Sequence, residues 1–217
     1  MAAIQQAGIA AVQNLTGLEL SGEGVLVGII DTGINYLDPI FRNLDGSTRI
    51  RRIWDQEEQS GTAPREIGYG SEYTREQINL AIQSENPKET VPSFDTDGHG
   101  TFVASVACGG ANPENLFIGA APEAEMVIVK LKEAKEYLRE YYFVDCDARC
   151  YQENDLVAAV FLSAEGTRRA EKTIGDLSGS WNKPWRTWRI FNPVRVSAKC
   201  GGERRNRDCD RKWQRGR

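Results

Sequence analysis

Two side chains in this sequence have the types and surroundings that general-base chemistry needs. Asp31 lies in Asp31-Thr32-Gly33, directly after an apolar run, and His99 lies between two glycines. A carboxylate that accepts the Nδ1 proton of an imidazole holds the ring in the tautomer that a general base requires. His99 is the single histidine of the chain, so any imidazole chemistry depends on it.

A plainer interpretation exists for each residue taken alone. A lone histidine near a helix start commonly satisfies only backbone hydrogen bonds, and Asp-Thr-Gly also occurs in ordinary turns. The surroundings of His99 favour chemistry instead, because Gly98 and Gly100 leave the backbone unshielded and let a strand and a ligand approach closely. A helix N-terminus also disfavours the imidazolium, which keeps a base available.

The elements expected to position the pair are buried parallel strands. Residues 24–30 form an unbroken, largely β-branched apolar run of strand length, and residues 126–131, which include Lys130, give a second signal for a buried strand. Such runs are typical of strands that are covered on both faces. Active sites of open α/β sheets gather beyond the carboxyl ends of the strands, which is where Asp31 is expected.

The rest of the first 162 residues predicts helices around these strands. A helix is expected to begin at or near His99, capped by Asp95 or Asp97. Residues 42–94 are polar and rich in turn formers, which indicates a surface excursion rather than core. Further helices are expected at residues 4–15, 74–83, 132–142 and 151–162. This order of elements predicts a parallel α/β domain.

Charge and aromatic content change together late in the chain. Residues 1–156 hold 12 Lys+Arg against 25 Asp+Glu, whereas residues 157–217 hold 15 against 6. Four of the five tryptophans also fall in the second part. Beyond Leu162 there is neither an apolar strand run nor a helical period.

The cysteines and the N-terminal residues indicate whether disulfides, a metal site or a signal peptide are to be expected. Five cysteines is an odd number without CxxC spacing, so we expect no disulfide framework. Cys146 and Cys150 have the spacing of half a metal site, but without a second pair we expect ordinary thiols. The first residues lack a basic segment and no apolar run reaches about 18 residues, which predicts no signal peptide and no membrane partner.

Three ordered segments carry a resemblance to a known family. They begin at Val25, at Asp97 and at Gly119, and they read as follows: Val-Leu-Val-Gly-Ile-Ile-Asp-Thr-Gly-Ile, Asp-Gly-His-Gly-Thr-Phe-Val-Ala, and Gly-Ala-Ala-Pro-Glu-Ala-Glu leading to Val129-Lys130. In this order they resemble the subtilases, or subtilisin-like serine proteases. The insertion before His99 and the stretch 35–39 are most similar to a clostridial branch that includes spore-germination proteases.

The resemblance covers residues 4–162 and carries expectations about fold and activity. It implies a three-layer α/β fold with a parallel sheet, here truncated and followed by an irregular basic tail. It also implies an Asp-His-Ser triad and endopeptidase activity on peptide or protein substrates, with Asp31 orienting and His99 acting as general base. We expect the protein to stay inside the cell, either in the cytoplasm or associated with the spore.

No cofactor is expected. Many subtilases follow Asp-Thr-Gly-Ile with a His-Pro-Asp segment whose aspartate binds calcium. The corresponding residues here are Asp38-Pro39-Ile40, so Ile40 takes the place of the aspartate ligand. The resemblance therefore does not extend to this calcium site.

The serine of the triad has no counterpart in the 217 residues. The family places it in a Gly-Thr-Ser-small-Ala segment, after an oxyanion-hole asparagine. The nearest approaches, at residues 166–168 and 178–180, lack that context and are read as chance. Removal of the serine in subtilisin costs about 2 × 10⁶ in turnover, so we expect this chain to be inactive by itself.

Two explanations remain for the change in composition near residue 157. A shifted reading frame would replace family sequence with an Arg- and Trp-rich tail, which is the explanation we favour. A genuine basic extension would instead bind nucleic acid, a partner that we do not expect. We divide the chain into a partial peptidase domain, residues 1–162, and a tail, residues 163–217. The alternative function is a catalytically dead pseudoprotease that serves as a binding or regulatory module.

Overall fold

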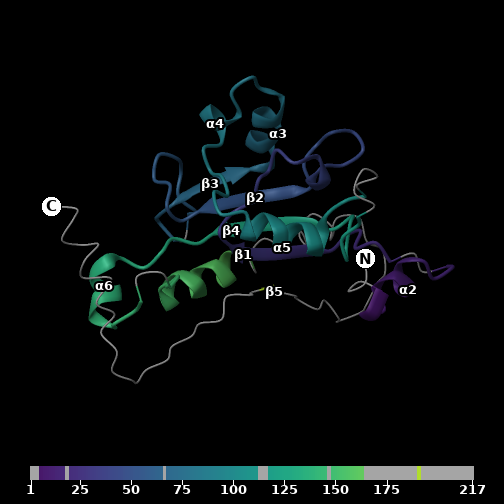
Figure 1. The fold of residues 1–217 in the computed structure, drawn as a ribbon. Helices are drawn as coiled ribbons and strands as arrows, with labels where there is room; N and C mark the ends of the chain where they lie inside the picture. The colour runs from purple at the N-terminus through teal and green to yellow at the C-terminus, as the bar shows by residue number, and fades with distance from the viewer. Residues whose placement is uncertain are drawn as a thin grey trace, which may run out of the picture.

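The structure is a computed structural model that describes residues 5–17, 20–65, 67–111, 117–145 and 148–163, and the backbone of 190–191. Its centre is a five-stranded sheet in the order β3-β2-β4-β1-β5. Strands β1 (Leu26–Asp31), β4 (Glu125–Lys130) and β2 (Ile50–Asp55) are parallel neighbours. Strand β3 (Ser71–Thr74) runs antiparallel to β2. Figure 1 shows these strands stacked beneath α3 and α4.

The central strands are buried on both faces, as their apolar runs predict. Ile29 and Ile128 belong to one core cluster, whereas Ile30 and Val129 belong to another. All four are fully buried, and successive side chains of a strand point to opposite faces of the sheet. Burying one such side chain stabilises the fold by about 1.5–3 kcal/mol. The sheet therefore separates two hydrophobic cores.

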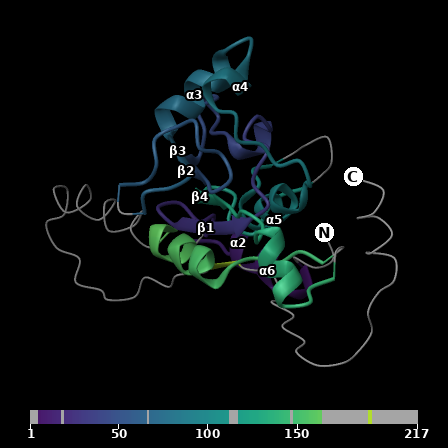
Figure 2. The ribbon, with the colours of Figure 1, turned by 90° about the vertical axis from the view of Figure 1, so that its left-hand side faces the viewer.

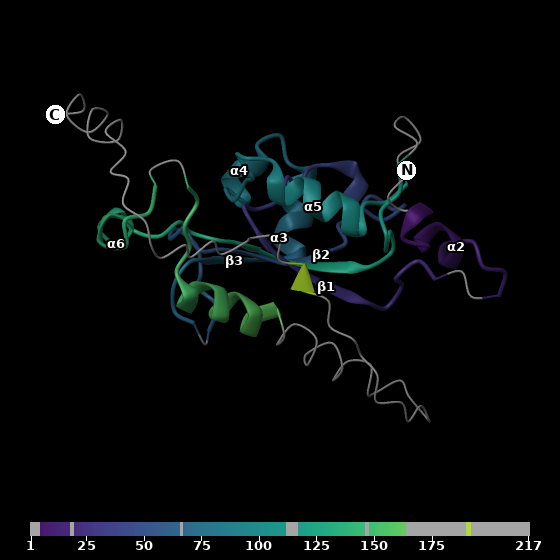
Figure 3. The same cartoon turned by 60° about the horizontal axis from the view of Figure 1, so that its bottom comes forward.

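Helices cover both faces of the sheet, which gives the three layers that were expected. Helix α5 (His99–Cys108) contributes Ala104 and Ala107 to the first core. A helix at residues 153–163 contributes Ala159 and Leu162 to the second core. Figure 3 shows α5 and this second helix on opposite sides of the sheet. The mixed α/β fold with a mostly parallel sheet confirms the predicted fold class.

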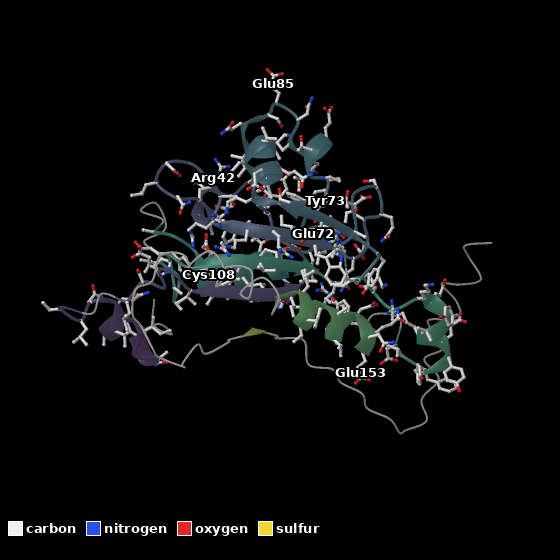
Figure 4. The ribbon with its side chains drawn as sticks, turned by 180° about the vertical axis from the view of Figure 1, so that it is seen from behind. Arg42, Glu72, Tyr73, Glu85, Cys108 and Glu153 are labelled. Atoms are coloured by element: carbon white, nitrogen blue, oxygen red, sulfur yellow. The ribbon has the colours of Figure 1, made fainter. Side chains whose placement is uncertain are left out.

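Residues 42–94 correct the sequence-based interpretation, because they are not simply a surface excursion. They supply β2 and β3, and Ile50, Ile53 and Trp54 of β2 are fully buried. The register of β2 against β4 shifts between Ile50 and Arg52, so the strand does not show a regular alternation. Figure 4 labels Glu72 and Tyr73 on β3, at the sheet edge that this segment builds.

Among the remaining helices, α3 has the predicted length, α2 and α6 are shorter than the ranges 4–15 and 132–142 that were predicted, and η1 and α4 were not predicted. Helix α3 (Arg75–Gln83) matches its predicted range and begins with a capping box at Thr74. Figure 2 shows α3 and α4 rising beside β3. The others are α2 (Ile9–Gln13), the 3₁₀ helix η1 (Pro39–Phe41), α4 (Pro87–Thr90) and α6 (Glu136–Tyr141).

One short strand follows the helix at residues 153–163. The backbone of β5 (Ile190–Phe191) pairs in parallel with Gly28 and Ile29 of β1. This pairing differs from the expectation that no strand lies beyond Leu162. Apart from Ser163, the rest of the predicted tail, including residues 166–168 and 178–180, lies outside the described residues.

Candidate active site

Asp31 and His99 meet at the carboxyl end of β1. The Nδ1 atom of His99 lies 2.8 Å from Oδ1 of Asp31, which is hydrogen-bonding distance. The aspartate side chain is 1% exposed, whereas the histidine side chain is 46% exposed. The carboxylate is thus buried, whereas nearly half of the imidazole side chain is exposed to solvent. This arrangement fixes one ring nitrogen and leaves Nε2 for a reacting group.

Two glycines let the helix and the strand come this close. A Cβ atom on Gly100 would lie 2.2 Å from the carbonyl oxygen of Gly33 and 3.1 Å from Cβ of Asp31. Gly33 itself has a φ of 123°, a region that side chains rarely adopt. The glycines of both motifs therefore have a steric purpose, which is to seat the start of α5 against the end of β1.

A third residue, Asp95, joins the two motifs through hydrogen bonds. Its Oδ1 accepts from Thr32 Oγ1 at 2.9 Å, and its Oδ2 accepts from Thr101 Oγ1 at 2.6 Å. Backbone N–H groups of Gly98 and Thr101 donate to it at 2.9 Å each. Burial alone would raise the pKa of Asp95, but these hydrogen bonds outweigh it and hold the pKa below its ordinary value.

Sequence reasoning considered Asp95 only as a candidate helix cap, and the structure gives it more to do. It accepts the N–H of Thr101 in the first turn of α5, which is a capping role. It also holds Thr32, whose Oγ1 accepts the N–H of Gly100 at 2.9 Å. The signal in the sequence was an aspartate four residues before His99, yet its link to Thr32 spans 63 residues. Local sequence contains no trace of that link.

The parallel strands end in a row of charged residues beside the pair. Lys130 of β4 lies between Asp31 of β1 and Asp55 of β2 in the register of the sheet. Its Nζ is 3.3 Å from Asp55 Oδ2 and 3.0 Å from Glu57 Oε2. Burial alone would lower the pKa of Lys130, but the neighbouring carboxylates, Asp55 foremost, raise it. The lysine therefore stays positively charged at this edge.

The residues at the calcium position do not fit a calcium ion. Asp38 Oδ1 accepts the N–H of Ile40 at 3.0 Å and so caps η1, and Ile40 itself offers no oxygen ligand in its side chain. Calcium takes six to eight oxygen ligands. Within the described ranges, no group of three or more His, Cys, Asp or Glu side chains is arranged to hold a metal.

The cysteines and the helices add two further findings. Cys108 is a free, buried thiol, and burial raises its pKa to about 12 even though the charge of Arg49 opposes the shift. Cys150 is free and partly exposed, and Cys146 lies outside the described residues.

In the part of the chain that is described, no helix has the length and apolar character needed to cross a bilayer.

Comparisons with known proteins show which sequences this chain resembles. The sequence model of the subtilase family matches residues 22–145, which include Asp31 and His99. Two subtilisin-like proteases of Arabidopsis thaliana, SBT2.2 and SBT2.3, are each 33% identical, over 102 and 101 residues. Each match covers 43% of this chain and 12% of the relative. The chain thus corresponds to a small part of these larger proteins.

A solved structure matches a longer stretch. The CspB protease of Clostridium perfringens superposes with a TM-score of 0.62 and 29% sequence identity. The match covers 77% of this chain and 30% of that protein. The family match spans more than half of the sequence, and the sheet, the helices and the Asp31–His99 contact are consistent with it. This chain belongs to the subtilase family.

Proposed function

We propose that Asp31 and His99 are the first two members of the catalytic triad of a subtilisin-like serine endopeptidase. In this proposal the carboxylate of Asp31 accepts a hydrogen bond from Nδ1–H and orients the ring, and Nε2 of His99 accepts the proton of a serine hydroxyl. The observation that carries it is the 2.8 Å contact between His99 Nδ1 and Asp31 Oδ1. Membership of the subtilase family supports the same reaction, which is hydrolysis of peptide bonds.

The protons balance as they do in other serine proteases. His99 would take the serine proton as the oxygen attacks the peptide carbonyl, and would return it to the leaving amine. The buried carboxylate of Asp31 stabilises the imidazolium that exists between these two steps. Its burial strengthens that interaction, because the carboxylate has little water around it.

The nucleophile is the missing part of the machinery. The 217 residues contain no Gly-Thr-Ser-small-Ala segment and no recognisable oxyanion-hole asparagine. Loss of one oxyanion donor alone costs a factor of about 10²–10³ in turnover. We therefore propose that the chain does not hydrolyse peptides by itself, and that a serine from further sequence would be needed.

The missing serine also favours a second candidate, a pseudoprotease that binds peptides or a partner protease without turnover. The two candidates differ in what the Asp31–His99 pair does. In a triad the pair moves a proton during turnover, whereas in a binding module the pair is a structural remnant. If the chain derives from an active protease, its 29% sequence identity to CspB supports our proposal that it is related to the clostridial branch of the family.

The pair can be tested directly because His99 is the single histidine. We expect nitrogen NMR to show the Nδ1–H tautomer in the neutral ring, with a low-field proton resonance from the hydrogen bond to Asp31. Asp31→Asn should remove that resonance and shift the tautomer ratio. Asp38→Asn, which changes a carboxylate that caps η1, is the matched control and should leave the resonance in place. An unchanged spectrum in Asp31→Asn would contradict the proposed pair.

Activity is tested with a fluorophosphonate, which labels activated serines. We expect the purified 217-residue chain to take up no label. Stoichiometric labelling that disappears in His99→Ala would show that the chain supplies its own nucleophile, and our proposal of inactivity would fail. If the chain takes up no label but binds a peptide or a partner protease in a pull-down, the pseudoprotease is supported instead.

A further inference from the structure

Helix α6 carries a cluster of exposed aromatic side chains. No residue of this helix is buried, so it adds nothing to either hydrophobic core. Figures 1 and 3 show it at the left-hand edge of the molecule, away from α5. The α6 aromatic cluster consists of four residues that are between 61% and 93% exposed: Tyr137, Tyr141, Tyr142 and Phe143. Exposed apolar groups that gather in this way mark interaction surfaces.

Phe143 takes the position after the helix that glycine normally takes. Its N–H donates to the carbonyl oxygen of Glu140 at 3.2 Å, and the N–H of Val144 donates to that of Arg139 at 2.9 Å. These two hydrogen bonds form a Schellman motif, in which the residue after the helix is left-handed. Phe143 has a φ of 53° and is 93% exposed. A bulky residue is strained there and gains little packing in return, which points to an interaction site.

The surroundings of the cluster are acidic. Residues 133–145 hold four Asp+Glu against two Lys+Arg. Glu133 pairs with Arg139 at 3.3 Å, whereas no ion pair of the described residues includes Glu136, Glu140 or Asp145. Exposed rings beside such carboxylates favour a partner that carries arginine, because a guanidinium stacks on aromatic rings and pairs with carboxylates. A second copy of α6 would instead bring like charges together.

The chain itself contains a segment with that chemistry. Residues 204–217 hold seven Lys+Arg against two Asp, and Trp213 adds an aromatic ring. They lie outside the described residues. Their net charge is opposite to that of residues 133–145. A segment tethered to the same chain has an effective concentration in the millimolar range, so even weak stacking and ion pairing favour its binding.

The chain is long enough for this segment to reach α6 from β5. Phe191 pairs with Ile29, whose partner on β4 is Ile128, so two strand spacings, about 10 Å, separate Phe191 from Ile128. From Ile128 to Glu136, the first residue of α6, eight residues span at most roughly 28 Å. The thirteen residues from Phe191 to Arg204 span up to roughly 45 Å. Arg204 can therefore reach the start of α6.

We propose that residues 204–217 of this chain bind the α6 aromatic cluster. Arginines of the segment stack on the exposed rings and pair with the carboxylates beside them, and Trp213 packs against Phe143. The inference goes beyond the proposed function, since neither Asp31 nor His99 takes part. It holds for the 217-residue chain whatever reading frame its tail comes from. The basic segment is then engaged within the chain rather than left for nucleic acid.

The ring of Trp213 reports on this binding in the full chain. We would incorporate 5-fluorotryptophan, record fluorine NMR spectra under reducing conditions and assign the Trp213 signal with Trp213→Phe. A synthetic peptide of residues 204–217 with the same label gives the signal of the unbound segment. We expect the Trp213 signal of the full chain to lie away from that of the peptide and to keep its position on dilution.

Phe143→Gly separates the ring from the stability of the helix end. Glycine suits the left-handed position, so α6 keeps its Schellman motif while the ring is lost. The Trp213 signal should nevertheless move to the position of the free peptide. Tyr141→Ser should move it most of the way. Leu80→Ser removes an apolar side chain that is 61% exposed on α3, so it is the matched control and should leave the signal in place.

The carboxylates beside the cluster have a test of their own. Glu136→Gln together with Glu140→Gln should lower the ratio of bound to free segment about tenfold at low salt, since each exposed ion pair contributes a factor of about three. Glu85→Gln together with Glu89→Gln removes the same charge near α3 and α4, where Figure 4 labels Glu85. This control pair should leave the ratio nearly unchanged.

Several results would overturn the inference. It fails if the Trp213 signal of the full chain coincides with that of the free peptide, or if Phe143→Gly leaves the signal in place. It also fails if the signal shifts on dilution, because the segment would then bind α6 of a second copy. Equal effects of the two pairs of glutamine substitutions would contradict the choice of α6. If Phe143→Gly did not fold, Tyr141→Ser would decide the matter.

Discussion

Gly100 approaches the backbone of Gly33 so closely that a methyl group on Gly100 would lie 2.2 Å from the Gly33 carbonyl oxygen. This contact joins the first turn of α5 to the residue that follows β1 by two positions. It fixes the spacing between Asp31 and His99, because Asp31 precedes Gly33 by two residues and His99 directly precedes Gly100. The glycine after the histidine is therefore part of the geometry of the site, although it carries no side chain.

Gly100→Ala should disturb the site through this contact. The added methyl group has backbone atoms on its path, so the start of α5 must move away from β1 and the Asp31–His99 contact must lengthen. We expect a loss of about 1–3 kcal/mol in the free energy of unfolding, measured in urea, and loss of the low-field His99 resonance. Ser105→Thr adds a methyl group on the same helix at a partly exposed position and should change neither quantity appreciably.

Asp95→Ala should be among the more destabilising changes near the site. It removes the acceptor of five hydrogen bonds, from the hydroxyls of Thr32 and Thr101 and the N–H groups of Asp97, Gly98 and Thr101. A buried donor left without a partner costs about 1–3 kcal/mol, so we expect a loss of about 3 kcal/mol or more in the free energy of unfolding. Asp45→Ala, at an exposed turn, is the control. Equal effects of the two changes would contradict the role given to Asp95.

The lowered pKa of Asp95 predicts a dependence of stability on acid. The folded chain holds this pKa below the value in the unfolded chain, which is about 3.9. The resulting stability is fully present above the unfolded pKa and is lost as the pH falls through the folded pKa. Urea unfolding between about pH 6 and pH 3 should show this decline. Asp95→Asn should show a shallower decline over the same range, and an identical slope would refute the assignment.

Replacing Arg49 by lysine should destabilise the fold much more than the same replacement at Arg51. Its guanidinium is buried and donates to the carbonyls of Ala124 and Cys108, at 2.9 and 2.7 Å, and to Ile40 at 2.6 Å. A lysine ammonium cannot match that planar fork, so Arg49→Lys should cost about 2–3 kcal/mol in the free energy of unfolding. Arg51→Lys, at a half-exposed ion pair, should stay within about 0.5 kcal/mol. Similar costs for the two substitutions would argue against a structural role for the three hydrogen bonds that Arg49 donates.

The elements that carry the candidate site could be predicted because their signals are local. An unbroken apolar run ends at Asp31, and glycines flank His99 where a helix begins. The strand β2 was missed because Arg51 and Arg52 interrupt its apolar residues. Their partners, Glu125 and Glu72, lie far along the chain, at 2.7 and 2.8 Å in space. Only the folded sheet shows why two arginines are acceptable in a buried strand.

The sequence by itself determined the residue types of the site, the strand that ends at Asp31 and the helix that begins at His99. Tertiary structure alone decided their separation of 2.8 Å, the position of Asp95 between the two motifs and the pairing of Arg149 with Asp97. The physical reason is one of range. Periodicity and turn chemistry act between neighbours in the chain, whereas hydrogen bonds and ion pairs depend on distances in space that packing of the whole sheet creates.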